Sequence, residues 1–293
     1  MVQDKSLGSR IFDIVNIVLL SIIGLVTILP FIYVLSGSFT SITELAEKQI
    51  VIIPTEISFD AYRYIFSTST VMKAIGVSIG ITLFGTLFSM LLTALMAYGL
   101  SKRDLRGRRL IMFLIVFTML FNGGMIPTFL VVKSLGLIDS YGALILPSAL
   151  NAFNLIIMRN FFQNLPEGLE ESAKIDGAGN WGILFRIVIP LSMPAIATIS
   201  LFYAVTYWNT YFQAVMYIND AAKWPVQVIL RQIVILSGAL TADTSDWGQD
   251  YVAPPEQTIK MAVIVVATVP ILLVYPFLQK HFAKGALLGS IKG

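Results

Sequence analysis

Six long apolar runs alternate with shorter polar segments along this chain of 293 residues. The runs cover residues 11–35, 74–100, 110–132, 141–158, 191–218 and 261–279, and the last five contain no Asp, Glu, Lys or Arg. Each run can cross the roughly 30 Å hydrocarbon core of a membrane as a helix. A helix satisfies its own backbone there, and the runs lack the alternation of a membrane β-barrel. The pattern therefore predicts an all-α membrane protein with six transmembrane helices.

Basic residues are concentrated in three of the polar segments. The loop 101–109 holds five basic residues against one acid, residues 280–293 hold three lysines and no acid, and the first ten residues hold Lys5 and Arg10. Six spans place all three segments on one side of the membrane, which the positive-inside rule makes cytoplasmic. We therefore expect a multi-pass protein with both termini in the cytoplasm.

This topology divides the chain into four parts. They are an N-terminal segment with the first transmembrane helix (1–36), an extracytoplasmic loop (37–73), a core with five transmembrane helices (74–279) and a cytoplasmic tail (280–293). Two long polar segments interrupt the core. Segment 163–190 is expected on the cytoplasmic side between the fourth and fifth spans, and the acid-rich loop 219–260 on the opposite side.

The cytoplasmic segment 163–190 predicts two helices joined by a tight turn. Asn164 is a suitable cap for the first helix, and Gly177 accepts the left-handed conformation that ends one. Asn180 is expected to cap the second helix, which Pro190 and Pro194 then interrupt before the next span. The residues alone leave two alternatives. The segment is either an amphipathic connector between two spans or a surface on which another protein docks.

The centre of this segment carries a spaced motif. It reads Glu171, Ser172, Ala173, two further residues, Asp176, Gly177 and Ala178, followed later by Ile189 and Pro190. The motif resembles the "EAA" loop of bacterial ATP-binding-cassette (ABC) importer permeases, in particular those of the maltose-type carbohydrate importers. Ser172 and Ile189 depart mildly from the Ala and Leu of that family. The resemblance implies a coupling helix-turn-helix seated in a cleft of the ATPase. Glu171 and Asp176 would fix the fold and polar contacts of the loop, and Gly177 would supply the turn.

The resemblance extends over essentially the whole chain. Stretches at 54–66, 122–140 and 207–212 and the ending KHFAKGALLGSIKG are similar to the matching parts of sugar-importer permeases. The subgroup it resembles handles complex oligosaccharides derived from plant or algal polysaccharides, of the alginate or pectin type. The resemblance implies a non-catalytic permease subunit of the bacterial plasma (inner) membrane. The implied partners are a second homologous permease in a heterodimer, an ATPase homodimer that binds ATP and Mg²⁺, and an extracytoplasmic sugar-binding protein, which the loop 219–260 would face.

Polar and aromatic residues within the spans are candidates for a sugar path, because a sugar needs hydrogen-bond partners and apolar faces on which to stack. The predicted path residues are Asn122, Asn154, Tyr207, Trp208, Asn209 and Tyr211. Asn122 stands beside Gly123-Gly124 and near Pro127, a combination that predicts a bend. The alternative is that the amides join helices and that the rings form interfacial belts. Gly76 and Gly80 are expected at helix-packing positions.

Several function classes are excluded or disfavoured. The chain has no Cys and one His, which excludes disulfides, multi-His metal sites and a Ser-His-Asp triad. The G-x-x-x-x-G-K-[ST] motif is absent, so we expect no nucleotide cofactor in this chain, and a net charge of +3 does not indicate nucleic acid. An ion-coupled secondary transporter is the main alternative, although its spans usually carry ionisable residues. An intramembrane enzyme lacks a recognisable catalytic pair at membrane depth.

Overall fold

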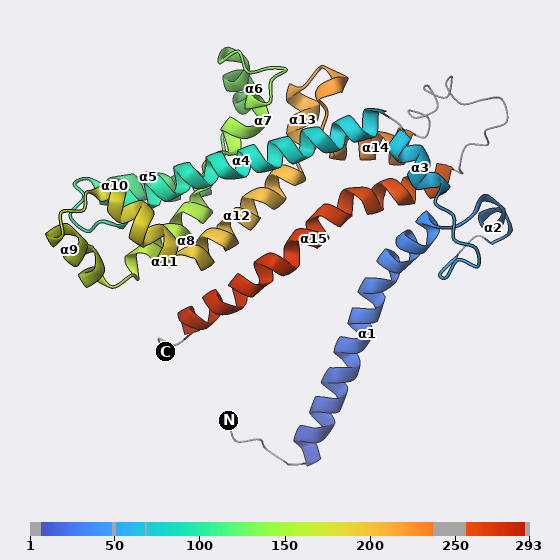
Figure 1. Ribbon diagram of the computed structural model, residues 1–293, viewed down its shortest axis with the longest axis horizontal. Coiled ribbons are helices and arrows are strands. Elements are labelled where there is room, and N and C mark those ends of the chain that lie inside the picture. The colour runs from blue at the N-terminus through green and yellow to red at the C-terminus, as the bar shows by residue number, and fades with distance from the viewer. Residues whose placement is uncertain (1–6, 49–50, 68, 237–255, 291–293) are drawn as a thin grey trace. The chain divides into compact units, whose positions relative to one another are not determined.

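Nearly all regular structure in this chain is helical. The computed structural model describes residues 7–48, 51–67, 69–236 and 256–290 (Figure 1). Within them the only extended pairing is an isolated bridge between Thr40 and Ile57. The prediction of an all-α protein is therefore confirmed for the described residues.

The helices follow one another in this order: α1 (Leu7–Ser38), α2 (Ile42–Glu47), α3 (Asp60–Ser67), α4 (Ser69–Ser101), α5 (Arg108–Leu120), α6 (Met125–Ser134), α7 (Gly142–Ile145), the 3₁₀ turn η1 (Leu146–Ser148), α8 (Ala152–Gln163), α9 (Glu167–Ile175), α10 (Asn180–Ile183), the π-helical segment η2 (Leu184–Val188), α11 (Ile189–Leu191), α12 (Met193–Trp208), α13 (Phe212–Tyr217), the 3₁₀ turn η3 (Ala221–Lys223), α14 (Val226–Leu236) and α15 (Glu256–Ser290).

Three helices are long and apolar enough to cross a membrane unbroken, namely α1, α4 and the Glu256–Val274 part of α15. The other candidate spans are pairs of helices that meet at a bend, and the last pair begins at Asn180, within the predicted cytoplasmic segment, and ends at Trp208, before the predicted end of the fifth span at residue 218. The pairs are Arg108–Leu120 with Met125–Ser134 (118°), Gly142–Ser148 with Ala152–Gln163 (52°), and Asn180–Leu191 with Met193–Trp208 (84°). The described chain thus contains three candidate spans, or up to six if each bent pair is one span.

Two of these bends have local causes in the sequence. Between α5 and α6, Gly124 has a φ of 90°, and its N–H donates to Asn122 Oδ1 at 2.9 Å. This confirms the prediction that the Asn122–Gly124 sequence bends its run. Before α8, the side chain of Asn151 accepts the N–H of Asn154 at 3.1 Å and caps the new helix.

The described residues form two compact units, which we describe separately. The first comprises residues up to Ser69 together with the described part of Gln232–Thr268. In this unit the carboxylate of Glu44, only 5% exposed, accepts the N–H of Thr55 at 3.1 and 2.9 Å. Ser38 Oγ lies 2.7 Å from the hydroxyl of Tyr62. The polar segment after α1, predicted as a loop, is therefore folded around two short helices, α2 and α3.

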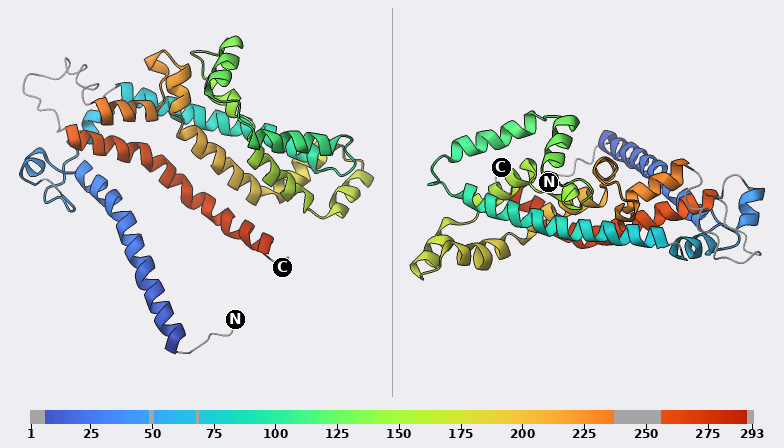
Figure 2. Two further views of the ribbon diagram at one scale, coloured as in Figure 1. Left: turned by 180° about the vertical axis from the view of Figure 1, so that it is seen from behind. Right: turned by 90° about the horizontal axis from the view of Figure 1, so that it is seen from above.

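The second unit comprises Thr70–Arg231 and the described part of the chain after Val269. Its longest helix is α4, alongside which α12 runs in Figures 1 and 2. Hydrogen bonds between side chains of α4 and α12 confirm that the two helices are packed together. The largest fully buried side chains of this unit are Leu144, Leu155, Met158, Ile183, Leu184, Ile199, Tyr203 and Tyr207.

The polar segment 219–260, predicted as a loop, contains helical structure. It includes η3, α14 and the beginning of α15. Residues 237–255, with the acids Asp243, Asp246 and Asp250, lie outside the described residues, as do 291–293 of the predicted tail. The described part of that tail continues α15 to Ser290.

Candidate functional site

The helix-turn-helix predicted from the motif residues is present at α9 and α10. Gly177 has a φ of 81°, and its N–H donates to the carbonyl of Lys174 at 3.0 Å. The N–H of Ala178 reaches back to the carbonyl of Ala173 at 2.9 Å. These two bonds close the end of α9 in the manner of a Schellman motif, which requires a left-handed residue that glycine supplies without strain. The turn at Gly177 is therefore confirmed.

The predicted caps are wrong, whereas the predicted interruption is present between Pro190 and Pro194, where Asn180–Leu191 meets Met193–Trp208 at 84°. Asn164 ends α8 instead of beginning α9, and the residue before α10 is Gly179 rather than Asn180. The helix that starts at Asn180 continues through Pro190 to Leu191. A π-helical segment, Leu184–Val188, precedes the proline. Such a local change in helix winding can satisfy backbone groups that a proline would otherwise leave without a partner.

The motif residues divide into exposed and enclosed groups. Glu171, Ser172, Asp176 and Gly177 are exposed, Ala178 is half-buried, and Ala173 is buried within its own chain. Ala173 therefore allows close packing inside this unit. Beside the motif, Ile175 is 86% and Trp181 66% exposed, and the Trp181 ring stacks on Phe185 at 6.1 Å. Large apolar side chains that protrude from a polar element are typical of a surface that a partner covers.

Side-chain contacts join both α8 and α9 to the end of α4. Lys102 forms an ion pair with Glu170 of α9, and its ammonium lies 4.1 Å from the centroid of the Tyr98 ring. Gln163 of α8 donates to the carbonyl of Ser101 at 3.1 Å. Figures 1 and 2 show α9 beyond this end of α4. The ion pair thus joins α9 to the residue that follows α4, and Gln163 joins α8 to the last residue of α4.

Sequence reasoning missed this connection, because it counted Lys102 only among the charges that set orientation. Glu170 lies one residue before the motif and far from Lys102 in the chain. A cavity of about 740 Å³ adjoins the pair, lined by Tyr98, Lys102, Arg106, Lys174 and Trp181 among others. The motif thus lies on a surface that combines cationic and aromatic side chains.

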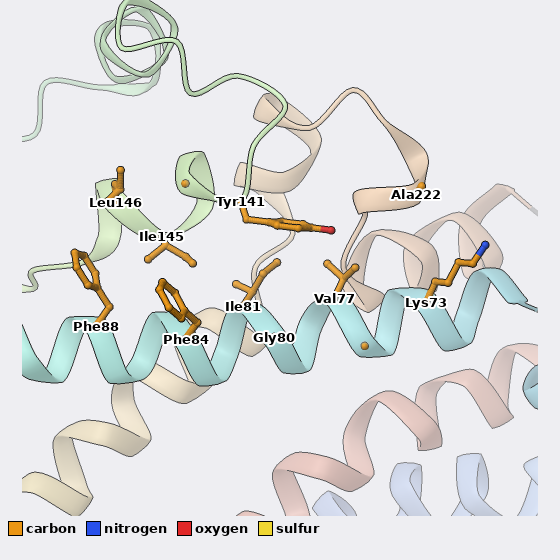
Figure 3. A pocket seen from close by; sticks show the side chains of 12 residues that line it. Lys73, Val77, Gly80, Ile81, Phe84, Phe88, Tyr141, Ile145, Leu146 and Ala222 are labelled. Carbon is orange, nitrogen blue, oxygen red and sulfur yellow. The ribbon is translucent and has the colours of Figure 1, made fainter.

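Elsewhere on α4, a cavity of about 810 Å³ separates this helix from the segment Tyr141–Leu146. Figure 3 shows Phe84 and Phe88 of α4 and Tyr141 on the opposite wall, with Lys73 farther along α4. Gly76 and Gly80 line it too, and a Cβ added to either would meet no atom within 4 Å. These glycines therefore face the cavity instead of packing against another helix of the described part of the chain. None of the six predicted path residues lines this cavity.

Three predicted path residues are buried in the second unit. Asn154 and Trp208 are each 5% exposed, and Tyr207 is 1% exposed. The hydroxyl of Tyr207 lies 2.7 Å from Ser89 Oγ and donates to the carbonyl of Ile145 at 3.3 Å. Its polar group therefore joins α4 to α7 within the chain. Trp208 lines a smaller apolar cavity of about 200 Å³.

The other three predicted path residues are more accessible. Asn122 and Asn209 are exposed, and both bond to nearby backbone, the latter through Nδ2 to the carbonyl of Val205 at 2.8 Å. Tyr211 is half-buried, and the guanidinium of Arg231 lies over its ring at 4.7 Å. The six residues therefore occupy several different environments, and their role in a sugar path stays a prediction.

An ionic clamp joins the α6–α7 loop to the segment after α13. Asp139, with a φ of 61°, accepts the N–H groups of Asn219 and Asp220 at 3.1 and 3.0 Å. Lys223 donates to the Asp139 carboxylate and to its backbone carbonyl, each at 2.9 Å. The hydrogen bond from Lys223 lowers the pKa of Asp139, aided by the N–H of Asp220. The same bond raises the pKa of Lys223.

Comparisons with known proteins identify the family of this chain. Residues 89–287 match the family described as "Binding-protein-dependent transport system inner membrane component". The chain is 65% identical to the polygalacturonan/rhamnogalacturonan transport system permease protein YtcP of Bacillus subtilis (strain 168), over 97% of this chain and 99% of that protein. It is also 59% identical to the protein LplC of the same organism, over 98% of this chain and 96% of that one.

A solved structure extends the likeness to the fold. It is the crystal structure of a bacterial ABC transporter involved in the import of the acidic polysaccharide alginate. The matching chain is 37% identical to this one with a TM-score of 0.87, and the match covers 96% of this chain and 100% of that chain. These relatives confirm the sequence-based identification of a non-catalytic permease subunit of an ABC sugar importer, and they lend no support to an ion-coupled transporter. The chain belongs to the family of binding-protein-dependent transport system inner membrane components.

Proposed function

We propose that this permease translocates oligosaccharides released from acidic cell-wall polysaccharides of the galacturonan type. The observation that carries the proposal is the 65% identity, over nearly the whole chain, to a permease named for polygalacturonan and rhamnogalacturonan transport. The 37% identical chain of the alginate importer supports the same chemical class, since alginate is also an acidic polysaccharide. The cargo would therefore be an oligomer that carries carboxylate groups along its length.

We infer a six-span topology in which each bent pair of helices crosses the membrane once. The apolar composition of the pairs supports this inference, as do the polar segments that separate them. The five basic residues of loop 101–109 then lie in the cytoplasm with both chain termini. The α9–α10 turn lies on the same side, within reach of a soluble ATPase. The Asp139–Lys223 clamp lies on the opposite side.

In this topology the α9–α10 turn is the ATPase-docking element. Its exposed Glu171 and Asp176 would make polar contacts, and Ile175 and Trp181 would enter the cleft of the ATPase. The Lys102–Glu170 pair would pass movement of α9 to α4. This chain would itself bind no cofactor, and ATP and Mg²⁺ would be held by the ATPase.

The complete importer would contain a second homologous permease, an ATPase homodimer and an extracytoplasmic sugar-binding protein. ATP binding would close the ATPase dimer and draw the docking elements of the two permeases together. The spans would then open outward and accept the sugar from the binding protein, and hydrolysis would return them to the inward-facing state. This is alternating access by rigid-body movement of packed helices.

Uptake by the reconstituted importer tests the proposal. The full complex and its binding protein are placed in proteoliposomes, and ATP-dependent uptake of labelled trigalacturonate is compared with that of the neutral maltotriose. We expect uptake of the acidic trisaccharide alone. Uptake of the neutral sugar without the acidic one would refute the proposed substrate class.

The same vesicles test the docking element through Glu171→Ala. Because Glu171 is exposed, the variant should insert and fold normally while binding-protein-stimulated ATP hydrolysis falls. If Glu171 contributes about 1–2 kcal/mol to docking, its removal lowers the affinity of the permease for the ATPase about 5- to 30-fold. Glu47→Ala, at another exposed glutamate, is the matched control and should leave uptake unchanged. Unchanged binding-protein-stimulated ATP hydrolysis in Glu171→Ala would refute the assignment of this turn as the docking element.

A further inference from the structure

A strongly cationic cavity of about 520 Å³ lies beside the first turn of α5. Its described lining consists of Arg103, Leu105, Gly107, Arg108, Arg109, Met112 and Arg159. Four of these seven residues are arginines, and no carboxylate is among them. The cavity is therefore a concentrated positive site, distinct from the neighbouring surface that carries the docking motif.

Membrane orientation alone does not account for this arrangement. The positive-inside rule requires basic residues in a loop, but it does not require them to converge on one cavity. Arg159 belongs to α8, a different helix from the one that follows the basic loop. Its Nε donates to the carbonyl of Leu100 at 3.4 Å and its Nη1 to Asn160 Oδ1 at 2.8 Å. Two neutral acceptors thus hold this guanidinium at the cavity without neutralising it.

The charge of the two enclosed arginines is not balanced within the described chain. Arg108 and Arg159 are half-buried, and neither takes part in the ion pairs found among the described residues. Lys102 and Lys223, by contrast, each have a carboxylate partner. Partial burial of a charge without a counter-charge is unfavourable, so the site favours an external anion.

The local geometry suits a phosphate group. A guanidinium can donate two parallel hydrogen bonds to phosphate oxygens. The cavity also adjoins the N-terminus of α5, where Gly107 provides no side-chain cap, and the positive end of the helix dipole adds to the attraction. The helix end only supplements the four arginines.

The surroundings of the cavity are apolar and indicate that the phosphate is part of a lipid. Leu105 and Met112 line the cavity with the arginines. Along α5, Leu110 is 63%, Phe113 64% and Leu114 51% exposed. A free anion would gain nothing from these side chains, whereas the glycerol and acyl chains of a phospholipid would cover them. Basic pockets at the ends of transmembrane helices are known to bind lipid head groups.

We propose that this cavity binds the phosphate group of an anionic phospholipid such as phosphatidylglycerol. Arg108 and Arg159 hold the phosphate from within the cavity, and Arg103 and Arg109 lie at its more exposed side. The bound lipid neutralises the half-buried charge and joins the start of α5 to the end of α8. The proposal goes beyond sugar transport and does not depend on the identity of the sugar.

A titration of the purified importer complex tests the site. Short-chain phosphatidylglycerol is added to the detergent-solubilised complex, and the thermal unfolding midpoint is followed. We expect a saturable rise that short-chain phosphatidylcholine and inorganic phosphate do not reproduce. Each basic residue near an anionic lipid is worth about a fivefold change in affinity, so R108Q/R109Q should weaken the response about 30-fold. R109Q alone removes an exposed side chain, and it should still weaken binding about fivefold.

The matched control is R106Q, which removes the same charge from the same loop outside this cavity and should leave the lipid response unchanged. Several outcomes would overturn the proposal. An equal rise with inorganic phosphate would identify a free anion as the ligand. An equal loss in R106Q would show that only the overall charge of the loop matters. If the double variant kept its lipid response and lost the ATPase instead, the arginines would be a protein contact.

Discussion

Two tyrosines, one turn apart on α12, have hydroxyl groups that are already engaged within the chain. Tyr203 lies 2.8 Å from Thr93 Oγ1 and accepts the N–H of Asn151 at 3.0 Å, and Tyr207 bonds to Ser89 and Ile145. A buried hydroxyl that lost these partners would incur a desolvation cost of about 1–3 kcal/mol. For Tyr207 the structure therefore favours a helix-joining role over contact with sugar, although it was predicted for the path.

Asp139 provides a prediction of pH dependence. Its pKa in the folded chain lies below the ordinary value of 3.8, chiefly because Lys223 donates to the carboxylate. For a carboxyl whose folded pKa is lowered, the stabilisation is present in full above the ordinary value, and it is lost as the pH falls through the lower, folded value. We expect the thermal midpoint of the purified importer to exceed that of Asp139→Asn at neutral pH, and the difference to vanish in strong acid.

Asparagine is the appropriate replacement at this position because it tolerates the left-handed backbone that Asp139 adopts. The control is Asp60→Asn, which breaks an exposed ion pair with Arg63 at 3.5 Å and should change the midpoint little. A difference between wild type and Asp139→Asn that grew on acidification would contradict the role assigned to the clamp.

Gly85 allows α4 to approach the Tyr207 ring of α12 closely. A Cβ at Gly85 would lie 2.9 Å from three ring atoms of Tyr207, whereas a Cβ at Gly80 would meet nothing within 4 Å. We expect Gly85→Ala to lower the thermal midpoint of the importer, since overpacking of this kind costs about 1–3 kcal/mol. Gly80→Ala should be neutral or stabilising because alanine favours a helix by about 1 kcal/mol. An equal loss in both variants would contradict the role of the Tyr207 contact.

The elements from α9 to α12 show which features the sequence could predict. The turn at Gly177 depends on the backbone freedom of a single residue, so it could be predicted locally. Asn164 was misjudged because its role depends on the neighbouring helix: α8 extends to Gln163, so Asn164 ends that helix. The Lys102–Glu170 pair could not be predicted, because it joins residues 68 positions apart.

Across the whole chain, hydropathy predicted where the apolar helical segments lie better than it predicted whether each of them is straight or bent. All six runs are largely helical, but among the described residues only α1, α4 and α15 provide an unbroken helix long enough for a span. The break in run 110–132 followed from its Asn-Gly-Gly sequence, and the bend of 84° before Met193 lies between Pro190 and Pro194, which were expected to interrupt the helix. The helix α14 was missed for a different reason: its sequence is apolar, but its 11 residues are too short for a span, and it was included in the polar segment 219–260.

The number of crossings can be decided by single cysteines, because the chain has none of its own. With six spans and a cytoplasmic N-terminus, cysteines at Thr43, Ser134 and Asn219 should react with a membrane-impermeant thiol reagent added outside cells, and those at Asp104 and Asn164 should react only after permeabilisation. All five positions are exposed, so side-chain burial does not confound the result. If only α1, α4 and α15 crossed, Ser134 and Asn219 would lie inside with Asp104. Protection of these two positions would therefore refute the six-span topology, and with it the cytoplasmic placement of both chain termini.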